Sequence, residues 1–154
     1  MIVRPARPAD IDAMSDPLIA SITQLCGLDH RHNPEIIAGW TANKTPEGVA
    51  AMLADPAARL FVSERDGRVA AVGSVRDERE IALNYVHPAH RFTGVSRALL
   101  ATMESYMSER GAAVARLRST VTAHRFYLAQ GWQDVGPIYT GRFIDAYLMD
   151  KRLA

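Results

Sequence analysis

The stretch from Ile81 to Gly111 constrains the fold of this chain most, because it joins a strand, a short loop and a helix. Residues 81–86 have the β-branched and aromatic content of a strand, and Pro88 ends it since proline cannot donate to a sheet ladder. From Val95 onward, apolar side chains recur at three- and four-residue spacing, which predicts one buried face of a helix. Gly111 supplies the expected C-terminal stop.

The loop between this strand and this helix has the features of an anion site. A helix start presents unpaired backbone N–H groups and the positive end of the helix dipole, which suits a phosphate or pyrophosphate. Gly94 would let a ligand approach the main chain closely, and Arg91 and Arg97 add positive charge. The chain contains neither Gly-x-x-x-x-Gly-Lys-Ser/Thr nor, after its first strand, Gly-x-Gly-x-x-Gly, so two common phosphate-binding loops are excluded.

Residues 91–96, Arg-Phe-Thr-Gly-Val-Ser, resemble a third phosphate-binding loop. This is the Arg/Gln-x-x-Gly-x-Gly/Ala signature of the GNAT superfamily of acyl-CoA-dependent N-acyltransferases, whose loop after the fourth strand holds the pyrophosphate of acetyl-CoA. Two positions depart from the family's pattern. Ser96 stands where Gly or Ala is usual, and Phe92 stands where many members have glycine.

A second stretch, residues 119–132, resembles the family's later signature, a short helix ending in Phe-Tyr-x-x-x-Gly-aromatic. Ala123 stands at the usual alanine, and Thr120 replaces the asparagine that is common near the start. The two signatures lie in the family's order and at a typical separation, with a strand-like segment at 113–117 between them. The resemblance therefore rests on two motifs rather than one.

The resemblance implies a single N-acetyltransferase domain over residues 1–154 with an α/β (α+β) fold. The expected sheet is mixed, mostly antiparallel, of about six or seven strands flanked by helices, and it splays after Val86 to admit the pantetheine arm. The chain in order agrees with this expectation. We expect a first strand at 1–4, helices before Pro56, strands at 60–64, 69–76 and 80–86, and a final strand at 142–149.

Composition limits the classes of partner. The chain is 48% hydrophobic, which is ordinary for a domain with a real core, and its formal charge of +1 gives no reason to expect nucleic acid as a partner. Its one cysteine, Cys26, cannot form an intrachain disulfide. No apolar run approaches ~18 residues and the N-terminus lacks a signal-peptide core, so we expect a cytoplasmic protein without membrane association.

The implied reaction is transfer of an acetyl group from acetyl-CoA to a primary amine by direct attack. The amine must be neutral when it attacks, and the leaving thiolate needs an acid. The resemblance places Tyr127 at the position of that acid; the alternative is a core aromatic. Glu80 is the candidate base, with a solvated residue of an acidic turn as the alternative. Asn84, expected on the strand face of Glu80, could hold a water or a substrate amide.

The remaining site residues are expected around the cofactor and the acceptor. The resemblance implies that Asp29, His30 and Trp40 contact the acceptor, while the alternative is helix capping by Asp29 and Asn33 with Trp40 in the core. The pattern Asp29-His30-x-His32 lacks a further ligand cluster, so we expect no metal. The expected cofactor contacts are Tyr85, Val86, Arg91, Phe92, Thr93, Gly94, Val95, Ser96, Arg97, Thr120 and Phe126.

Two other functions stay open at this point: a non-catalytic module that senses acyl-CoA, and a toxin-type acetyltransferase acting on aminoacyl-tRNA. The second is disfavoured because the sequence shows no basic block. The acceptor is a small-molecule or peptide amine whose identity the motifs do not specify. The resemblance also implies a possible homodimer through the C-terminal strands, where Tyr139, Phe143 and Tyr147 offer apolar surface.

Overall fold

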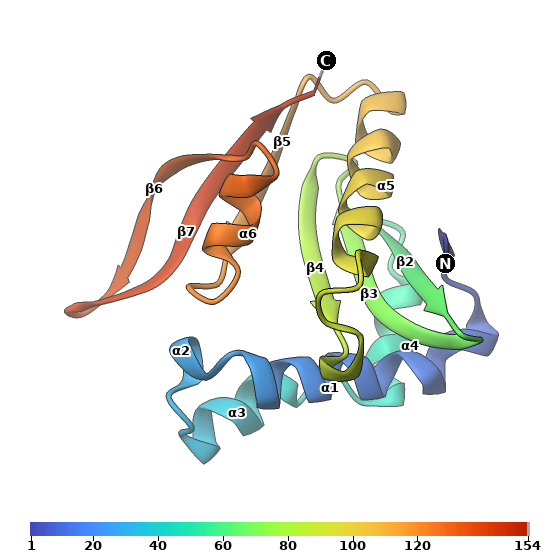
Figure 1. Ribbon diagram of the computed structural model, residues 1–154, viewed down its shortest axis with the longest axis horizontal. Helices are drawn as coiled ribbons and strands as arrows, with labels where there is room; N and C mark the ends of the chain where they lie inside the picture. The colour runs from blue at the N-terminus through green and yellow to red at the C-terminus, as the bar shows by residue number, and fades with distance from the viewer. Residues whose placement is uncertain (154) are drawn as a thin grey trace.

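The structure, a computed structural model, describes residues 1–153 (Figure 1). Its elements in chain order are β1 (Ile2–Pro5), the 3₁₀ turn η1 (Pro8–Asp10), α1 (Ile11–Leu25), α2 (Gly27–His30), α3 (Pro34–Thr41), α4 (Pro46–Ala54), β2 (Ala58–Arg65), β3 (Arg68–Arg76), β4 (Glu80–Val86), η2 (Pro88–His90), α5 (Val95–Glu109), β5 (Val114–Ser119), α6 (His124–Ala129), β6 (Gln133–Thr140) and β7 (Phe143–Arg152). None of the described helices is long and apolar enough to cross a membrane.

The strands form one sheet of seven in the order β1-β2-β3-β4-β5-β7-β6. Every neighbouring pair is antiparallel except β4 and β5, which run parallel. This parallel pair is joined only at Glu80↔Arg116 and Ile81↔Leu117, and beyond these positions the two strands diverge (Figure 1). The mixed, mostly antiparallel sheet that splays at β4 confirms the predicted fold class.

Helices cover both faces of the sheet half made by β2, β3 and β4. On one face, Leu99 and Met103 of α5 belong to a core that also contains Ile81 of β4. A side chain at Gly73 of β3 would meet Met103 Sδ at 2.7 Å, so α5 packs closely on the sheet at this glycine. On the other face, α1, α4 and the sheet share a second core that includes Met14. The two cores hold the start of α5 beside the end of β4.

One irregularity in β4 decides which of its side chains face the splayed region. Adjacent residues of β3 pair with Ile81 and Leu83, so Ala82 between them is an extra residue, a β-bulge. Ile81 packs in the core under α5, whereas Leu83 packs against the core under α1. The alternation of side chains is therefore shifted by one at the bulge. Glu80 and Asn84 lie on opposite faces of β4, and the prediction that they share a face is wrong.

The hairpin of β6 and β7 extends beyond α6 at the far edge of the sheet (Figure 1). Tyr139 and Phe143 are exposed there, and the guanidinium of Arg31 lies 3.9 Å from the centre of the Phe143 ring. Tyr147 instead stacks on His124, with ring centres 3.6 Å apart and planes within 1°. Two of the three aromatic residues expected at a dimer surface are thus exposed, and the homodimer stays a prediction.

A buried carboxylate connects β1 to the start of α1. Asp10 accepts hydrogen bonds from the Arg4 guanidinium at 2.8 and 2.9 Å and from the Arg7 backbone N–H at 2.7 Å. The hydrogen bonds from Arg4 lower the pKa of Asp10 to about 2, and the Arg7 N–H adds to this effect against the opposing effect of burial. This contact caps η1, which leads directly into α1.

We predict that Asp10→Asn lowers the free energy of unfolding by about 2 kcal/mol at pH 7. Because the folded-state pKa is depressed, the stabilisation is complete above the unfolded pKa and is lost as pH falls toward about 2. Urea unfolding at pH 7 and at pH 2–3 measures the difference, which should shrink at the acid end. The exposed Asp66→Asn serves as control, and an unchanged gap at low pH contradicts the assignment.

Candidate active site

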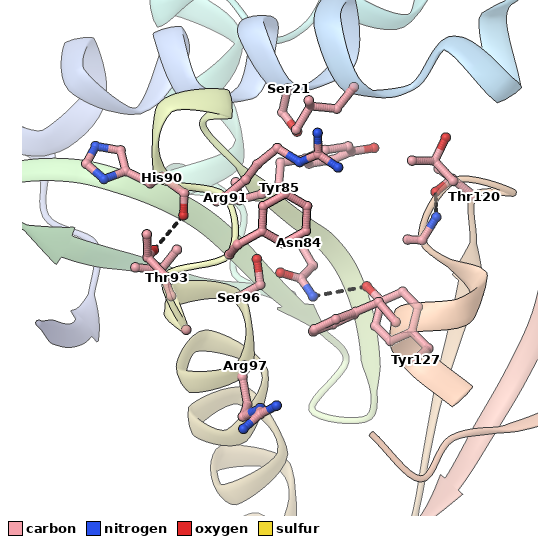
Figure 2. A pocket seen from close by; sticks show the side chains of 18 of the residues that line it. Ser21, Asn84, Tyr85, His90, Arg91, Thr93, Ser96, Arg97, Thr120 and Tyr127 are labelled. Carbon is pink, nitrogen blue, oxygen red and sulfur yellow. Dashed lines mark hydrogen bonds between the residues drawn. The ribbon is translucent and has the colours of Figure 1, made fainter. Parts of the chain in front are cut away.

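The divergence of β4 from β5 opens a cleft of about 630 Å³ between the two halves of the sheet (Figure 2). Its walls come from four regions of the chain: the end of α1, the end of β4 with the loop into α5, the turn after β5, and one face of α6. Segments as far apart in sequence as Ser21 and Gln130 therefore line one space. All eleven residues expected at the cofactor lie along this cleft.

The start of α5 points an uncapped helix end at the cleft. Its N-cap is Gly94 at φ +87°, and none of the described side chains caps the helix. The first intrahelical bond is donated by the Ala98 N–H to the Gly94 carbonyl, so the N–H groups of the preceding turn are not used in that ladder. Ser96 and Arg97 lie on this first turn beside the cleft (Figure 2). Backbone donors, a hydroxyl and a cation thus converge, as an anionic group requires.

The loop before this helix has a residue in an unusual backbone conformation. Phe92 has φ +60°, in the left-handed region that costs a non-glycine residue about 1–2 kcal/mol. This explains why glycine is common at this position of the motif. The Arg91 guanidinium carbon lies 4.7 Å from the centre of the Phe92 ring. The loop is anchored on its other side by the Thr93 hydroxyl, which donates to the His90 carbonyl at 2.5 Å.

Tyr127 of α6 faces Asn84 of β4 across the cleft (Figure 2). The Asn84 amide donates to the Tyr127 hydroxyl oxygen at 3.1 Å, so the O–H of Tyr127 is free to donate elsewhere. The ring packs edge-to-face against Phe126 and Trp132, and burial raises the pKa of Tyr127 to about 12. Tyr127 is therefore both a core aromatic and a protonated hydroxyl in the cleft.

Glu80 is not part of this arrangement. It lies at the opposite end of β4, where it is paired in register with Arg76 and Arg116, and it is absent from the lining of the cleft. The bulge also turns it to the face opposite Asn84. A base for the acceptor amine should face the cleft, and Glu80 does not.

Asp29 is engaged in a structural contact rather than exposed to the cleft. Its carboxylate accepts hydrogen bonds from the Val121 N–H at 2.7 Å, the Thr122 N–H at 3.2 Å and the Thr122 hydroxyl at 2.5 Å. These bonds join α2, on one side of the splay, to the turn between β5 and α6 on the other. We call this contact the Asp29 bridge; it corrects the expectation that Asp29 contacts the acceptor.

His30 and Trp40 also lie outside the cleft lining. His30 is fully buried, with Nε2 bonded to the Ile22 carbonyl at 2.8 Å and Nδ1 accepting from the His32 N–H at 3.0 Å. The two bonds fix a neutral ring with the proton on Nε2, so His30 has no free nitrogen for a substrate. Trp40 donates to the Tyr85 hydroxyl at 3.3 Å, and it acts on the cleft only through Tyr85.

The end of α1 contributes cleft residues that sequence reasoning missed. Ser21, Leu25 and Cys26 line the wall opposite α6. Burial raises the pKa of the Cys26 thiol to about 12, so it stays protonated. The helical periodicity of this segment predicts a buried face, but nothing in it indicates which turn meets the cleft. Within residues 1–153, no group of three potential ligands lies close enough to hold a metal ion.

Comparisons with known proteins agree on one family. The family model described as "Acetyltransferase (GNAT) domain" matches residues 28–153. A GCN5-related N-acetyltransferase from Rhodopseudomonas palustris superposes with a TM-score of 0.86 at 23% identity, over 99% of this chain and 95% of that chain. The PaiA N-acetyltransferase from Thermoplasma acidophilum, in complex with coenzyme A, gives 0.79 at 15% identity over 98% of each chain.

An aminoglycoside 6'-N-acetyltransferase from Enterococcus faecium gives a TM-score of 0.71 at 14% identity, over 100% of this chain and 98% of that chain. At these identities the structures show a shared fold. No curated protein sequence matches the chain.

We predict that Asp29→Ala lowers the free energy of unfolding by about 2–3 kcal/mol, because three donors of the turn after β5 lose a charged acceptor. Chemical denaturation measures the change, with Glu35→Ala, an exposed acid nearby, as the matched control. A variant as stable as the unsubstituted protein would return Asp29 to the role of a free side chain.

Proposed function

Because this chain belongs to the GNAT acetyltransferase domain family, we propose that it transfers the acetyl group of acetyl-CoA to a primary amine by direct attack. One observation carries the proposal: an uncapped helix N-terminus and a protonated, free tyrosine O–H line the same cleft. The first suits the pyrophosphate of a CoA thioester, and the second suits its leaving sulfur. A module that only senses acyl-CoA has no need for a hydrogen-bond donor beside the leaving sulfur.

The residues at the start of α5 fit a pyrophosphate. A Cβ added to Gly94 would meet only Met1 Cε, at 3.8 Å, so the main chain is open to a ligand there. The backbone donors of residues 94–97, the Ser96 hydroxyl and the guanidinium groups of Arg91 and Arg97 would hold the two phosphates. Ser96 adds a donor where the family pattern has none. Acetyl-CoA, when bound, would supply the acetyl thioester.

Tyr127 would act as the general acid. Its hydroxyl oxygen already accepts a hydrogen bond from Asn84. Within the described residues, the O–H of Tyr127 donates to no acceptor, so it is available to the thioester sulfur. The raised pKa of about 12 keeps the proton in place at neutral pH. Transfer of this proton to the departing sulfur would neutralise the thiolate, and the Asn84 amide would then stabilise the tyrosinate that is left.

The acceptor would lose its proton to water rather than to a carboxylate. Asn84 and the hydroxyl of Tyr85 offer polar atoms in the cleft near Tyr127, and they would hold such a water. The lining has two cations, Arg91 and Arg97, and both are assigned to the pyrophosphate, so they do not select the acceptor. We propose a small-molecule or peptide amine as the acceptor.

The first test of this proposal concerns the cofactor. We expect Gly94→Asp to reduce the affinity for acetyl-CoA by at least about tenfold, because a carboxylate at the helix start opposes the pyrophosphate. Calorimetry gives the affinity, and the rise in melting temperature with ligand gives an independent readout.

Gly67→Asp is the control for that variant, since Gly67 also has a positive φ, +73°, and its Cβ would meet nothing within 4 Å. It lies in the turn between β2 and β3, away from the cleft. A folded Gly94→Asp protein with unchanged affinity for acetyl-CoA would remove the assignment of this loop.

The second test concerns the acid. We expect Tyr127→Phe to keep its affinity for acetyl-CoA and to lose roughly 10²–10⁴-fold in turnover, the usual range for removal of a general acid. An acceptor screen that follows thiol release from acetyl-CoA first identifies the amine. Turnover of that amine is then compared among the variants.

Two controls accompany the acid test. Tyr106→Phe removes a hydroxyl from a tyrosine of α5 that packs against Phe61, and Glu80→Gln removes the charge at the far end of β4. Both should turn over the acceptor at nearly the normal rate. Full activity in Tyr127→Phe would show that this residue is a core aromatic only. If Glu80→Gln lowered turnover while Tyr127→Phe did not, the role in proton transfer would belong to Glu80 instead of Tyr127.

A further inference from the structure

The side chain of Phe92 is exposed to an extent that packing does not explain. It is 93% exposed, the highest value among the large hydrophobic residues on the surface, and its backbone stands at φ +60°. A bulky residue in the left-handed region is an outlier that glycine would avoid. Strained residues of this kind gather at ligand contacts, where binding offsets their cost. The exposure and the positive φ of Phe92 therefore indicate that its ring contacts a ligand.

Phe92 lies at the rim of the cleft, two residues before the helix N-cap. The N-cap and the first turn of α5 hold the pyrophosphate in the proposed function, and Tyr127 marks the inner end where the thioester must reach. The pyrophosphate of CoA carries pantetheine on one side and adenosine on the other. With pantetheine running inward to Tyr127, the adenosine is directed outward, to the rim.

We propose that Phe92 is a stacking surface for the adenine of CoA, and that it makes this site prefer CoA thioesters over thioesters of 4'-phosphopantetheine. The Arg91 guanidinium lies over the ring, 4.7 Å from its centre, and holds it in place by a cation–π contact. The opposite face of the ring is left for the base. This inference rests on the proposed function for the identity of the ligand and adds a discriminating residue to it.

The test uses two ligands and a variant that preserves the backbone. Phe92→Ala keeps a Cβ at the same φ, so it removes the ring without relaxing the loop. We expect its affinity for CoA to fall about tenfold, which is within the range of one base–aromatic stack, while its affinity for 4'-phosphopantetheine stays unchanged. Phe92→Tyr should restore the affinity for CoA. Dephospho-CoA, which retains the adenine, should lose affinity as CoA does.

Calorimetry with the intact protein measures all three ligands and requires no acceptor. Tyr139→Ala, which removes another exposed aromatic, from β6, is the control and should leave every affinity unchanged. Equal losses for CoA and 4'-phosphopantetheine in Phe92→Ala would overturn the proposal, because the ring would then act on the loop or the pantetheine arm. An unchanged affinity for CoA would overturn it as well.

The failure of this inference is distinguishable from failure of the proposed function. If the unsubstituted protein binds CoA and Gly94→Asp weakens it while Phe92→Ala does not, only the role of Phe92 is lost. If the unsubstituted protein binds no CoA, the proposed function is lost and this inference with it. Phe92→Gly adds a separate readout, because it removes the ring and also relieves the strain of a side chain at positive φ. If this variant still binds CoA weakly, the ring rather than the strain supplies the affinity.

Discussion

The separation of β4 from β5 is the constraint on which the site depends. Two parallel strands that pair at only two positions leave their facing edges without ladder partners beyond that point, at the centre of the sheet. A ligand that runs between them can meet backbone groups and side chains from both halves at once. The same gap is a weakness, because each half has fewer contacts holding it to the other. The fold compensates by joining the halves on the side of α2.

The Asp29 bridge supplies this connection. One carboxylate accepts three hydrogen bonds from the turn that precedes α6, and α6 carries Tyr127. The distance between Tyr127 and the β4 side of the cleft is thus set partly by Asp29, a residue outside the cleft lining. The stack of His124 on Tyr147 fixes the same short helix from the other side. Precise placement of Tyr127 results from contacts on both sides of α6.

Much of the fold and of the loop between β4 and α5 was predictable from sequence because their signals are local. Proline after β4, glycine before α5 and the helical period of α5 all lie within one short stretch, and structure follows them there. Long-range effects were not predictable in this way. Asp29 finds its partners 92 and 93 residues away, and the tautomer of His30 is set by a carbonyl of α1. The wrong placement of Glu80 has a third cause, the bulge, for which Ala82 gives no sequence signal.

That bulge makes the register of β4 as important as its composition. Ala82 contributes a methyl group and no chemistry, yet it shifts the phase of every residue that follows it on the strand. If Ala82 instead took a regular place in the ladder, Leu83 would take the direction of Asn84 and the tyrosine would lose its neighbour. The register of β4 against β3, rather than the identity of residue 82, therefore decides which side chain faces Tyr127. A comparison of related chains that scores identities alone would overlook the position that decides what their clefts contain.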